Sequence, residues 1–329
     1  MVSNRLASIS WVRLLAMIMI IVCHMFQYYD NELCKWFNVG VQIFLVISGF
    51  LYGRKSEIDP VLFLRTNFPK ILIPYLLLMS IILALYGIFH PELLEVTNVL
   101  KSLVCASTIP GLGHLWFVGY ILFCYLITPY LYWIKKASYS YVKPKQVVLL
   151  YVSIIVLVQV VGIAFDSYFA PDRISCYIIG FFMADLFDRF GSAMKKAVSA
   201  FFIVSAFICV GIEITIKYIL SIDLSGYYQI AFQAFGHYSH LLLGIALFLI
   251  LASVFNSSRY SKLLVWSDKY SYPIYLVHLI FILSPFSLMS ITRFSGLNVI
   301  ITVACIVITG IALQYLTNLI SNKGLVKNV

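Results

Sequence analysis

The chain has 329 residues, of which 62% are hydrophobic and only 11% are charged. A water-soluble domain needs far more polar surface than this composition provides, so the numbers exclude an ordinary soluble protein and predict one embedded among membrane lipids. The formal net charge of +10 could suggest a nucleic-acid partner, but the loop positions of the basic residues explain the charge without one. No nucleic acid is therefore expected among the partners.

Apolar runs long enough to cross the bilayer recur along the chain, with short polar breaks between them. An α-helix needs about 20 mostly apolar residues to span the hydrocarbon, and ten runs fit this requirement. The breaks are too short for a separate soluble domain, so we expect one membrane-embedded domain over residues 1–329. The predicted fold is all-α, a polytopic bundle of about ten transmembrane helices. These helices are expected near residues 11–29, 38–53, 71–89, 114–134, 146–164, 173–187, 197–217, 236–255, 271–289 and 297–319.

The basic residues divide unequally between the two sides of this predicted bundle. Cytoplasmic loops carry the excess of Lys and Arg in membrane proteins, so we expect both termini in the cytoplasm and the protein in the inner membrane. The run of Lys135, Lys136, Lys143 and Lys145 is interpreted as part of that excess, with binding of a cofactor's phosphates as the alternative. Of the 23 Lys and Arg residues, those on the outer side are only Lys35, Lys101, Arg173, Lys217 and Arg293.

The first predicted span carries two ionisable residues, Arg13 and His24. Ionisable groups cost about 2.5–3.5 kcal/mol at the centre of a membrane helix and usually face the protein interior. The spacing of the two residues is about three helical turns, so their side chains share one face about 16 Å apart along the axis. The spacing alone leaves two interpretations open. Either the two residues form a functional pair, or Arg13 is a flanking charge and His24 bonds a neighbouring carbonyl group.

Short segments further along the chain favour the functional interpretation of Arg13 and His24. The second span reads Val-Gly-Val-Gln-Ile-Phe-Leu-Val-Ile-Ser-Gly-Phe-Leu over residues 39–51. Together with Arg13 and His24, this segment resembles the acyltransferase 3 family of integral membrane acyltransferases. The likeness covers nearly the whole chain, because it continues in the third, fourth and ninth spans. The segments there are Lys70–Tyr75, His114–Phe117 and Tyr275–His278.

The resemblance implies transfer of an acyl group, commonly acetyl, from acyl-coenzyme A on the cytoplasmic side to a carbohydrate hydroxyl at the outer face. Acyl-coenzyme A, with acetyl-coenzyme A as the expected form, is then the donor substrate, and no permanently bound cofactor is implied. The essential Arg and His of the family correspond to Arg13 and His24. Its Arg-x-x-Arg cluster falls on Asn67 and Lys70, with Arg65 two positions earlier. We expect Arg65 and Lys70, with Arg13, to bind the donor.

The first span also fits this chemistry by its residue types. Acylation of a sugar hydroxyl needs a base to take the hydroxyl proton, and a neutral imidazole is suited to that near pH 7. His24 could act as this base, or it could carry the acyl group itself as a nucleophile. Arg13 could hold phosphate or pantetheine groups of the donor, or stabilise the thiolate that forms. The family often has Asp where Gln42 stands, so the resemblance supplies no carboxylate partner at that position.

Four further residues are candidates for binding the acceptor substrate. The structural alternatives are that a His or Trp at the outer interface anchors a helix, and that a mid-span His bonds a carbonyl group. Elsewhere, Glu213 is expected to pair with Lys217 four residues later, and His237 and His240 are expected at the edge of a loop. The four candidates are His114, Trp116, His278 and Ser48.

The sequence lacks the motifs of several other enzyme classes. It has no P-loop, no His-Glu-x-x-His and no Gly-x-Ser-x-Gly, which makes nucleotide hydrolysis and zinc chemistry poor candidates. Its seven cysteines show no Cys-x-x-Cys spacing, so no metal site is expected. Cys34 and Cys105 fall in loops on the same side, where a disulfide between them is possible.

Two functions from different classes account for these features. The first is an O-acetyltransferase whose partner is a cell-surface polysaccharide or its lipid-linked precursor. The alternative is a transporter or flippase that moves a glycan or an acyl intermediate. Ten spans allow two inverted five-helix repeats, but the sixth span has no counterpart of Arg13 and His24, which favours the enzyme. Nothing in the sequence specifies an oligomeric state.

Overall fold

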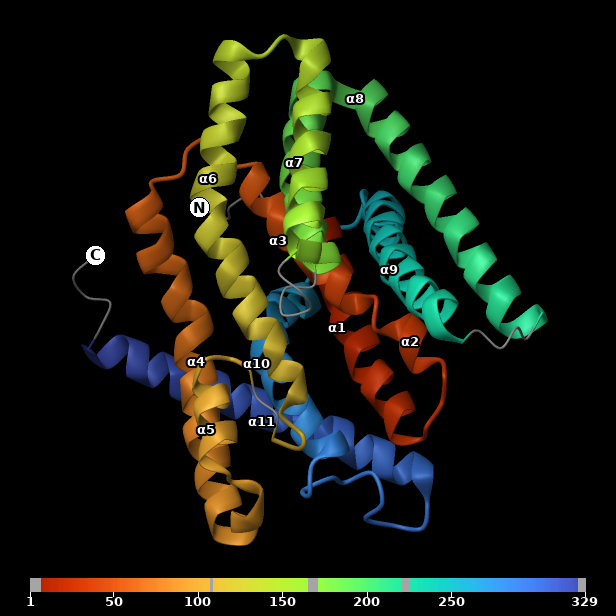
Figure 1. Ribbon diagram of the computed structural model, residues 1–329. Coiled ribbons are helices and arrows are strands. Elements are labelled where there is room, and N and C mark those ends of the chain that lie inside the picture. The colour runs from red at the N-terminus through yellow and green to blue at the C-terminus, as the bar shows by residue number, and fades with distance from the viewer. Residues whose placement is uncertain (1–6, 107–108, 165–170, 221–224, 325–329) are drawn as a thin grey trace. The chain divides into compact units, whose positions relative to one another are not determined.

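The structure is a computed structural model that describes residues 7–106, 109–164, 171–220 and 225–324. All regular elements in these ranges are helices, so the prediction of an all-α membrane bundle is confirmed (Figure 1). Arg5 and Lys327, which count toward the predicted cytoplasmic charge, lie outside the described residues. The α-helices are α1 (Ala7–Tyr28), α2 (Cys34–Phe37), α3 (Gly40–Gly53), α4 (Pro60–Phe89), α5 (Val96–Leu103), α6 (Trp116–Tyr141), α7 (Pro144–Ala164), α8 (Pro171–Ile214), α9 (Gly226–Val254), α10 (Lys262–Leu283) and α11 (Ser295–Gly324).

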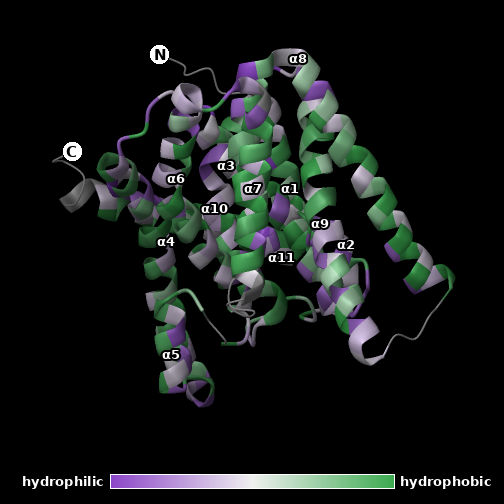
Figure 2. Cartoon of the chain, turned by 45° about the horizontal axis from the view of Figure 1, so that its top comes forward, coloured by the Kyte–Doolittle hydropathy of each residue, from purple (hydrophilic) through white to green (hydrophobic). Residues whose placement is uncertain are grey.

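The ten predicted spans all fall on helices of the structure. Seven helical stretches of the described chain are long and apolar enough to cross a membrane. Hydrophobic residues cover most of α7 in Figure 2, although its apolar stretch, Gln146–Gly162, is shorter than those seven. The remaining predicted spans fall on α10 and on the first part of α8. The chain is therefore a multi-pass membrane protein, and the number of ten spans stays a prediction.

Helix α8 contains both the sixth and the seventh predicted spans. Gly191 interrupts it with a φ of 66° and a ψ of −150°, which is not a helical conformation. Glycine adopts this region readily because it has no Cβ. The predicted loop between the two spans is thus reduced to one bend at Gly191.

Several helices extend beyond the apolar runs that predicted them. Helix α4 begins at Pro60 rather than near residue 71, because Asp59 caps it and proline fits the first helical turn. The cap is a 2.7 Å hydrogen bond from the Leu62 amide to Oδ1 of Asp59. Helix α9 likewise begins at Gly226 rather than near residue 236. Hydropathy marks the lipid-facing part of a helix, whereas caps and turns set where the helix ends.

Helix α10 is displaced toward the N-terminus of the chain relative to its predicted range of 271–289. It begins at Lys262, in a polar stretch that hydropathy does not identify as a span. It ends at Leu283 because the Ser284 hydroxyl accepts a 2.9 Å hydrogen bond from the amide of Phe286. This local turn competes with continued helix. The apolar residues after it belong to the following loop.

Helices α2 and α5 were not predicted, because both are too short to form a span. Helix α5 has polar and apolar faces, and its exposed apolar side chains recur at helical spacing in Val96, Leu100 and Leu103. The Tyr75 hydroxyl of α4 donates a hydrogen bond to the Ser102 carbonyl oxygen, which attaches α5 to α4. An exposed apolar face of this kind is typical of a helix that lies at the membrane surface.

The chain divides into two compact units, and the first contains α3 packed closely on α8 and α9. A Cβ at Gly49 of α3 would overlap the Tyr177 carbonyl oxygen, and a Cβ at Gly180 of α8 would overlap that of Val46. Glycine at both positions lets the two backbones approach closely, as small residues do between membrane helices. The segments of this unit are Met1–Ile20, Lys35–Ile58 and Ile127–Leu264.

The second unit contains α4, α5, α11 and most of α10, with the C-terminal part of α1 and the N-terminal part of α6. The Tyr272 hydroxyl of α10 donates a 2.9 Å hydrogen bond to the Ile71 carbonyl oxygen of α4. A Cβ at Gly310 of α11 would meet Ile274 of α10. The segments are Ile21–Cys34, Asp59–Leu126 and Val265–Val329. The expectation of a single domain over residues 1–329 stays a prediction.

Candidate active site

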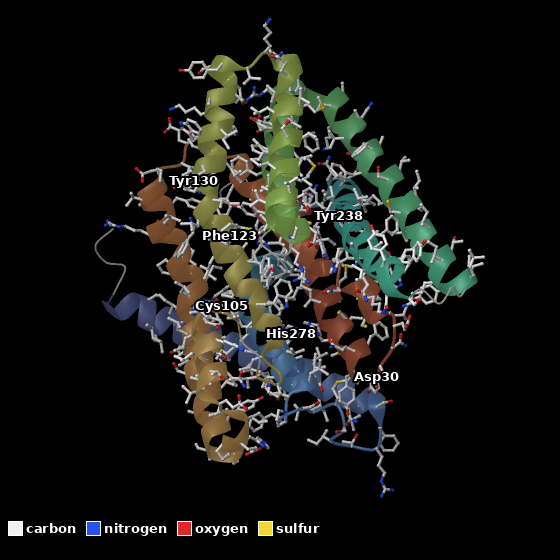
Figure 3. All side chains as sticks on the ribbon, viewed as in Figure 1. Asp30, Cys105, Phe123, Tyr130, Tyr238 and His278 are labelled. Atoms are coloured by element: carbon white, nitrogen blue, oxygen red, sulfur yellow. The ribbon has the colours of Figure 1, made fainter. Side chains whose placement is uncertain are left out.

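Three histidines from distant parts of the chain lie together in the second unit. His24 is on α1, His114 is in the 3-10 turn Gly113–Leu115 ahead of α6, and His278 is on α10 (labelled in Figure 3). The ring centroids of His24 and His278 are 5.1 Å apart, and those of His114 and His278 are 4.7 Å apart. His278 is fully buried and His114 nearly so. We call these three residues the histidine cluster.

One nitrogen of each ring is fixed by a protein acceptor. Nε2 of His114 donates to the Leu276 carbonyl oxygen at 3.0 Å, and Nδ1 of His278 donates to the Tyr275 carbonyl oxygen. Nδ1 of His24 donates to Oε1 of Gln27 at 2.9 Å. An imidazole that donates from one nitrogen keeps a lone pair on the other. The cluster therefore offers three nitrogens that can accept a proton or a hydrogen bond.

Two of these acceptor nitrogens are buried without a partner. They are Nδ1 of His114 and Nε2 of His278. Burial of an acceptor without a donor costs free energy, and most buried polar atoms in proteins are hydrogen-bonded. Neither of these two nitrogens carries a hydrogen to offer the other. A ligand or a water that donates hydrogen bonds is therefore the natural complement of the cluster.

Packing around His114 fixes the position of its ring. The Tyr275 hydroxyl donates a 2.6 Å hydrogen bond to the His114 carbonyl oxygen, and the Tyr275 ring lies edge-on to the His114 ring. Gly111, with a φ of 75°, lies so close to Ser284 that a Cβ would overlap that side chain. The turn that carries His114 is thus held against α10, from which His278 also comes. These contacts preorganise the two buried rings.

The other candidates of the second unit lie outside the histidine cluster. Trp116 is half-buried at the start of α6, and its ring packs on Tyr120 with centroids 5.2 Å apart. Arg65 and Lys70 are both exposed on α4. Nζ of Lys70 donates a 3.4 Å hydrogen bond to Oδ1 of Asn67, which is itself buried. The structure thus leaves two exposed cations near the positions of the basic family motif.

Two candidates belong to the first unit. Arg13 is half-buried on α1, three turns before His24 on the same helix. Ser48 is half-buried on α3, next to Gly49, at which α3 packs closely on α8. The serine-glycine segment therefore has a packing role in this structure, whatever else Ser48 contacts.

Sequence reasoning missed a buried ionic group in the first unit. Asp185 of α8 is fully buried and accepts hydrogen bonds from the hydroxyls of Tyr139 at 3.0 Å and Tyr151 at 2.6 Å. Its carboxylate lies 3.2 Å from Nε of Arg189 and 3.8 Å from Nζ of Lys135. Lys135 also donates to the Gly53 carbonyl oxygen at 2.6 Å. The signal was an acidic residue inside an apolar run, the pattern that marks buried ion pairs in membrane helices.

Lys135 was interpreted as a charge of a cytoplasmic loop, and its position in the structure corrects that interpretation. It lies within α6 and is 9% exposed. His240 was likewise expected at a loop edge, but α9 begins 14 residues earlier, at Gly226, so His240 lies well inside a helix. Both errors have one cause, because polar residues near a span end were assigned to loops.

The structure also tests the disulfide that the sequence allowed and shows how the possible metal ligands are arranged. None of the seven cysteines, all of which lie within the described ranges, forms a disulfide, so Cys34 and Cys105 are not joined. The Cys23 thiol instead donates a 3.1 Å hydrogen bond to the Cys34 carbonyl oxygen. Among the residues that the structure describes, no three His, Cys, Asp or Glu side chains are arranged to hold a metal ion.

Comparison with known proteins adds one finding. A family model described as an acyltransferase domain matches residues 6–319, which is nearly the whole chain. No curated protein and no solved structure matches the chain.

Proposed function

Because the chain belongs to the acyltransferase 3 family, we propose that it transfers an acetyl group from cytoplasmic acetyl-coenzyme A to a hydroxyl of a cell-surface or lipid-linked polysaccharide. The observation that carries this proposal is the contact of His24 with the buried His278 and its neighbour His114. The family match supports an acyltransferase over a transporter or flippase. The acetyl group, the donor and the polysaccharide are the proposed refinements.

In this proposal His24 is the general base. Its Nδ1 hydrogen is engaged by Gln27, which leaves Nε2 to take the proton of the acceptor hydroxyl. The hydroxyl oxygen then attacks the thioester carbonyl, the carbon–sulfur bond breaks, and the coenzyme A thiolate recovers the proton from His24. The alternative is that Nε2 attacks the thioester itself, the carbon–sulfur bond breaks and coenzyme A leaves as the thiolate; the acetyl-imidazole then transfers its acetyl group to the acceptor hydroxyl, whose proton returns to the freed Nε2. Both routes require the same free nitrogen.

The two buried histidines are proposed to bind the acceptor. Nδ1 of His114 and Nε2 of His278 lack donors, and the hydroxyls of a sugar are donors. A sugar that fills this place satisfies the buried acceptors and brings one hydroxyl near Nε2 of His24. Trp116 and Ser48 remain proposals for acceptor binding, supported by the family likeness alone.

The donor is proposed to bind through cations. Arg13 on α1 and the exposed Arg65 and Lys70 on α4 suit the phosphate groups of coenzyme A, because charged N–H groups form the strongest hydrogen bonds to phosphate oxygens. Their predicted cytoplasmic position agrees with where acyl-coenzyme A is made. We propose that the protein lies in the inner membrane with both termini in the cytoplasm.

Coenzyme A release by the purified full chain tests this function. Release from acetyl-coenzyme A should depend on added surface polysaccharide that has been stripped of its acetyl groups. His24→Gln keeps hydrogen bonding but cannot take the proton, so kcat should fall about 10²–10⁴-fold. His90→Gln, which removes an imidazole from the loop after α4, should keep full activity at equal membrane levels. Normal turnover in His24→Gln, or release that never depends on glycan, contradicts the proposal.

A further inference from the structure

A second group of buried polar side chains lies in the first unit, where α2, α8 and α9 meet. Nε2 of His240 on α9 lies 3.9 Å from Oε1 of Glu213 on α8, a separation too long for a hydrogen bond. The Trp36 ring of α2 lies against the His240 ring, with centroids 5.5 Å apart. Asp172, at the other end of α8, is close enough to act electrostatically on His240. We call Trp36, Asp172, Glu213 and His240 the α8–α9 polar cluster.

Three polar side-chain atoms of this cluster are buried without a hydrogen-bond partner. They are Oδ2 of Asp172, Oε2 of Glu213 and Nε2 of His240. Asp172 is 5% exposed, although it stands in the first turn of its helix. A carboxylate can only accept hydrogen bonds, and a buried one without a partner is costly. These atoms therefore raise the free energy of the folded protein until a ligand with several hydrogen-bond donors binds to them.

The charge balance indicates an uncharged group. Lys35 and Lys217 act electrostatically on Glu213, so the two carboxylates are not an isolated negative charge. A cationic ligand would gain little there, whereas a ligand with several hydroxyls supplies donors and adds no charge. Gln42 of α3 points to the same need, because its Oε1 is buried without a partner and its Cβ lies against Gly244, one turn beyond His240.

The aromatic residues supply the second half of a sugar site. The Trp36 indole is half-buried beside His240 and offers a broad apolar face, which suits the C–H face of a sugar ring. Tyr238 of α9 (labelled in Figure 3) donates a 2.7 Å hydrogen bond from its hydroxyl to Oε1 of Gln159 on α7. Asp172 also acts electrostatically on Tyr238. The apolar face of Trp36 and the buried polar atoms of the cluster thus lie side by side.

We propose that the α8–α9 polar cluster is a binding subsite for an uncharged sugar residue of the acceptor glycan. The identification of this ligand with the acceptor rests on the proposed function. Trp36 stacks on the ring, Asp172 and Glu213 accept hydrogen bonds from its hydroxyls, and Nε2 of His240 forms a further hydrogen bond with a hydroxyl, which can donate or accept. Lys35, Arg173 and Lys217, near these residues in the sequence, belong to the side predicted to face outward, where such a glycan is met.

Saturation-transfer NMR tests this subsite on the full chain in lipid nanodiscs, because glycoside detergents would compete for it. The probes are oligosaccharides released from the deacetylated surface polysaccharide of the cells that make the protein. We expect saturation transfer to the sugar protons, and roughly tenfold weaker binding in Trp36→Ala and in Asp172→Asn. Trp133→Ala and Asp188→Asn, which change exposed residues of α6 and α8, are the matched controls and should bind normally.

Each outcome separates the subsite from the enzymatic function. Binding that survives in His24→Gln but weakens in Trp36→Ala and Asp172→Asn supports the subsite, whether or not coenzyme A is released. No saturation transfer to any of these oligosaccharides overturns it, since the cluster then holds only water. Equal binding in Trp36→Ala, Asp172→Asn and the two controls also overturns it. Glycan-dependent coenzyme A release alongside either of these results leaves the proposed function standing without this subsite.

Discussion

His24 differs from the other two members of the histidine cluster in the kind of partner that holds it. His114 and His278 donate to carbonyl oxygens of the backbone, which cannot turn away. His24 donates to the Gln27 side chain, which is exposed and can rotate. A ring that must gain and lose a proton in each cycle benefits from a partner that can move. Under the proposed function, this contrast favours His24 as the reacting member and the buried pair as fixed acceptors.

Gln27 is then a positioning residue for His24. Gln27→Leu removes the acceptor for Nδ1–H, so Nε2 carries the hydrogen in a larger share of molecules and cannot act as a base. We expect kcat to fall about tenfold while the KM for acetyl-coenzyme A is unchanged. Gln27→Glu keeps an acceptor at the same place and should retain more activity than the Leu variant. Equal activity in the Leu variant and the unaltered protein would remove Gln27 from the mechanism.

Arg13 offers a test of donor binding. A guanidinium grips a phosphate through two parallel hydrogen bonds, whereas the ammonium group of Lys acts as a point charge. Arg13→Lys should therefore raise the KM for acetyl-coenzyme A about tenfold, measured by coenzyme A release at equal membrane levels. Arg65→Lys, at an exposed position of α4, gives the comparison for a side chain held less tightly. Full turnover of Arg13→Lys at low donor concentration would reduce Arg13 to a flanking charge.

The sequence identified the members of the histidine cluster without predicting that they meet. His24 followed from an imidazole inside an apolar run and from the family likeness. His114 and His278 were candidates for separate reasons, and their 4.7 Å contact joins residues 164 positions apart. No periodicity carries information over that distance. The contact of His24 with Gln27, by contrast, could have been predicted from the sequence, because residues three apart on a helix are neighbours.

At the scale of elements, hydropathy located the helices and local chemistry decided their ends. The apolar run of α4 gave the span, but Asp59 and Pro60 moved its start by three turns. Helix α5 was not predicted because it has only eight residues and one apolar face. When hydropathy is averaged over the length of a membrane span, such a segment looks like a loop. The bend at Gly191 was expected as a longer loop, since sequence does not tell a loop from a single left-handed residue.

The close packing of α3 on α8 gives a prediction about Gly49. A Cβ at this position would overlap the Tyr177 carbonyl oxygen, so Gly49→Ala should destabilise the protein by about 1–3 kcal/mol and lower the midpoint of thermal unfolding. The control is Gly211→Ala in the second part of α8, where an added Cβ meets nothing within 4 Å. That variant should unfold at the same temperature or slightly higher, because alanine favours helix. Equal midpoints for both variants would show that the two backbones are further apart than described.

At the scale of the whole molecule, the fold class and the membrane character followed from composition, while the division into two compact units did not. The boundary between the units falls inside two continuous helices, α1 and α6, so no linker or change in composition marks it. Composition reports the solvent that surrounds a chain. It carries little information about which of several similar apolar helices pack together, because in lipid that choice depends on small residues and polar contacts such as those of Gly49 and Asp185.

The orientation of the whole chain in the membrane rests on its charge asymmetry, and cysteine labelling tests it. Glu95 and Arg293 are exposed in loops on the predicted outer side, whereas Lys55 and Lys195 are exposed on the predicted cytoplasmic side. In a background with Cys34→Ser, an impermeant thiol reagent should label Glu95→Cys and Arg293→Cys in intact cells. It should label Lys55→Cys and Lys195→Cys only after the cells are permeabilised, which also controls for the reactivity of each thiol. Labelling of the second pair in intact cells would place the predicted donor side outside, where no acetyl-coenzyme A is available, and would overturn the proposed direction of transfer.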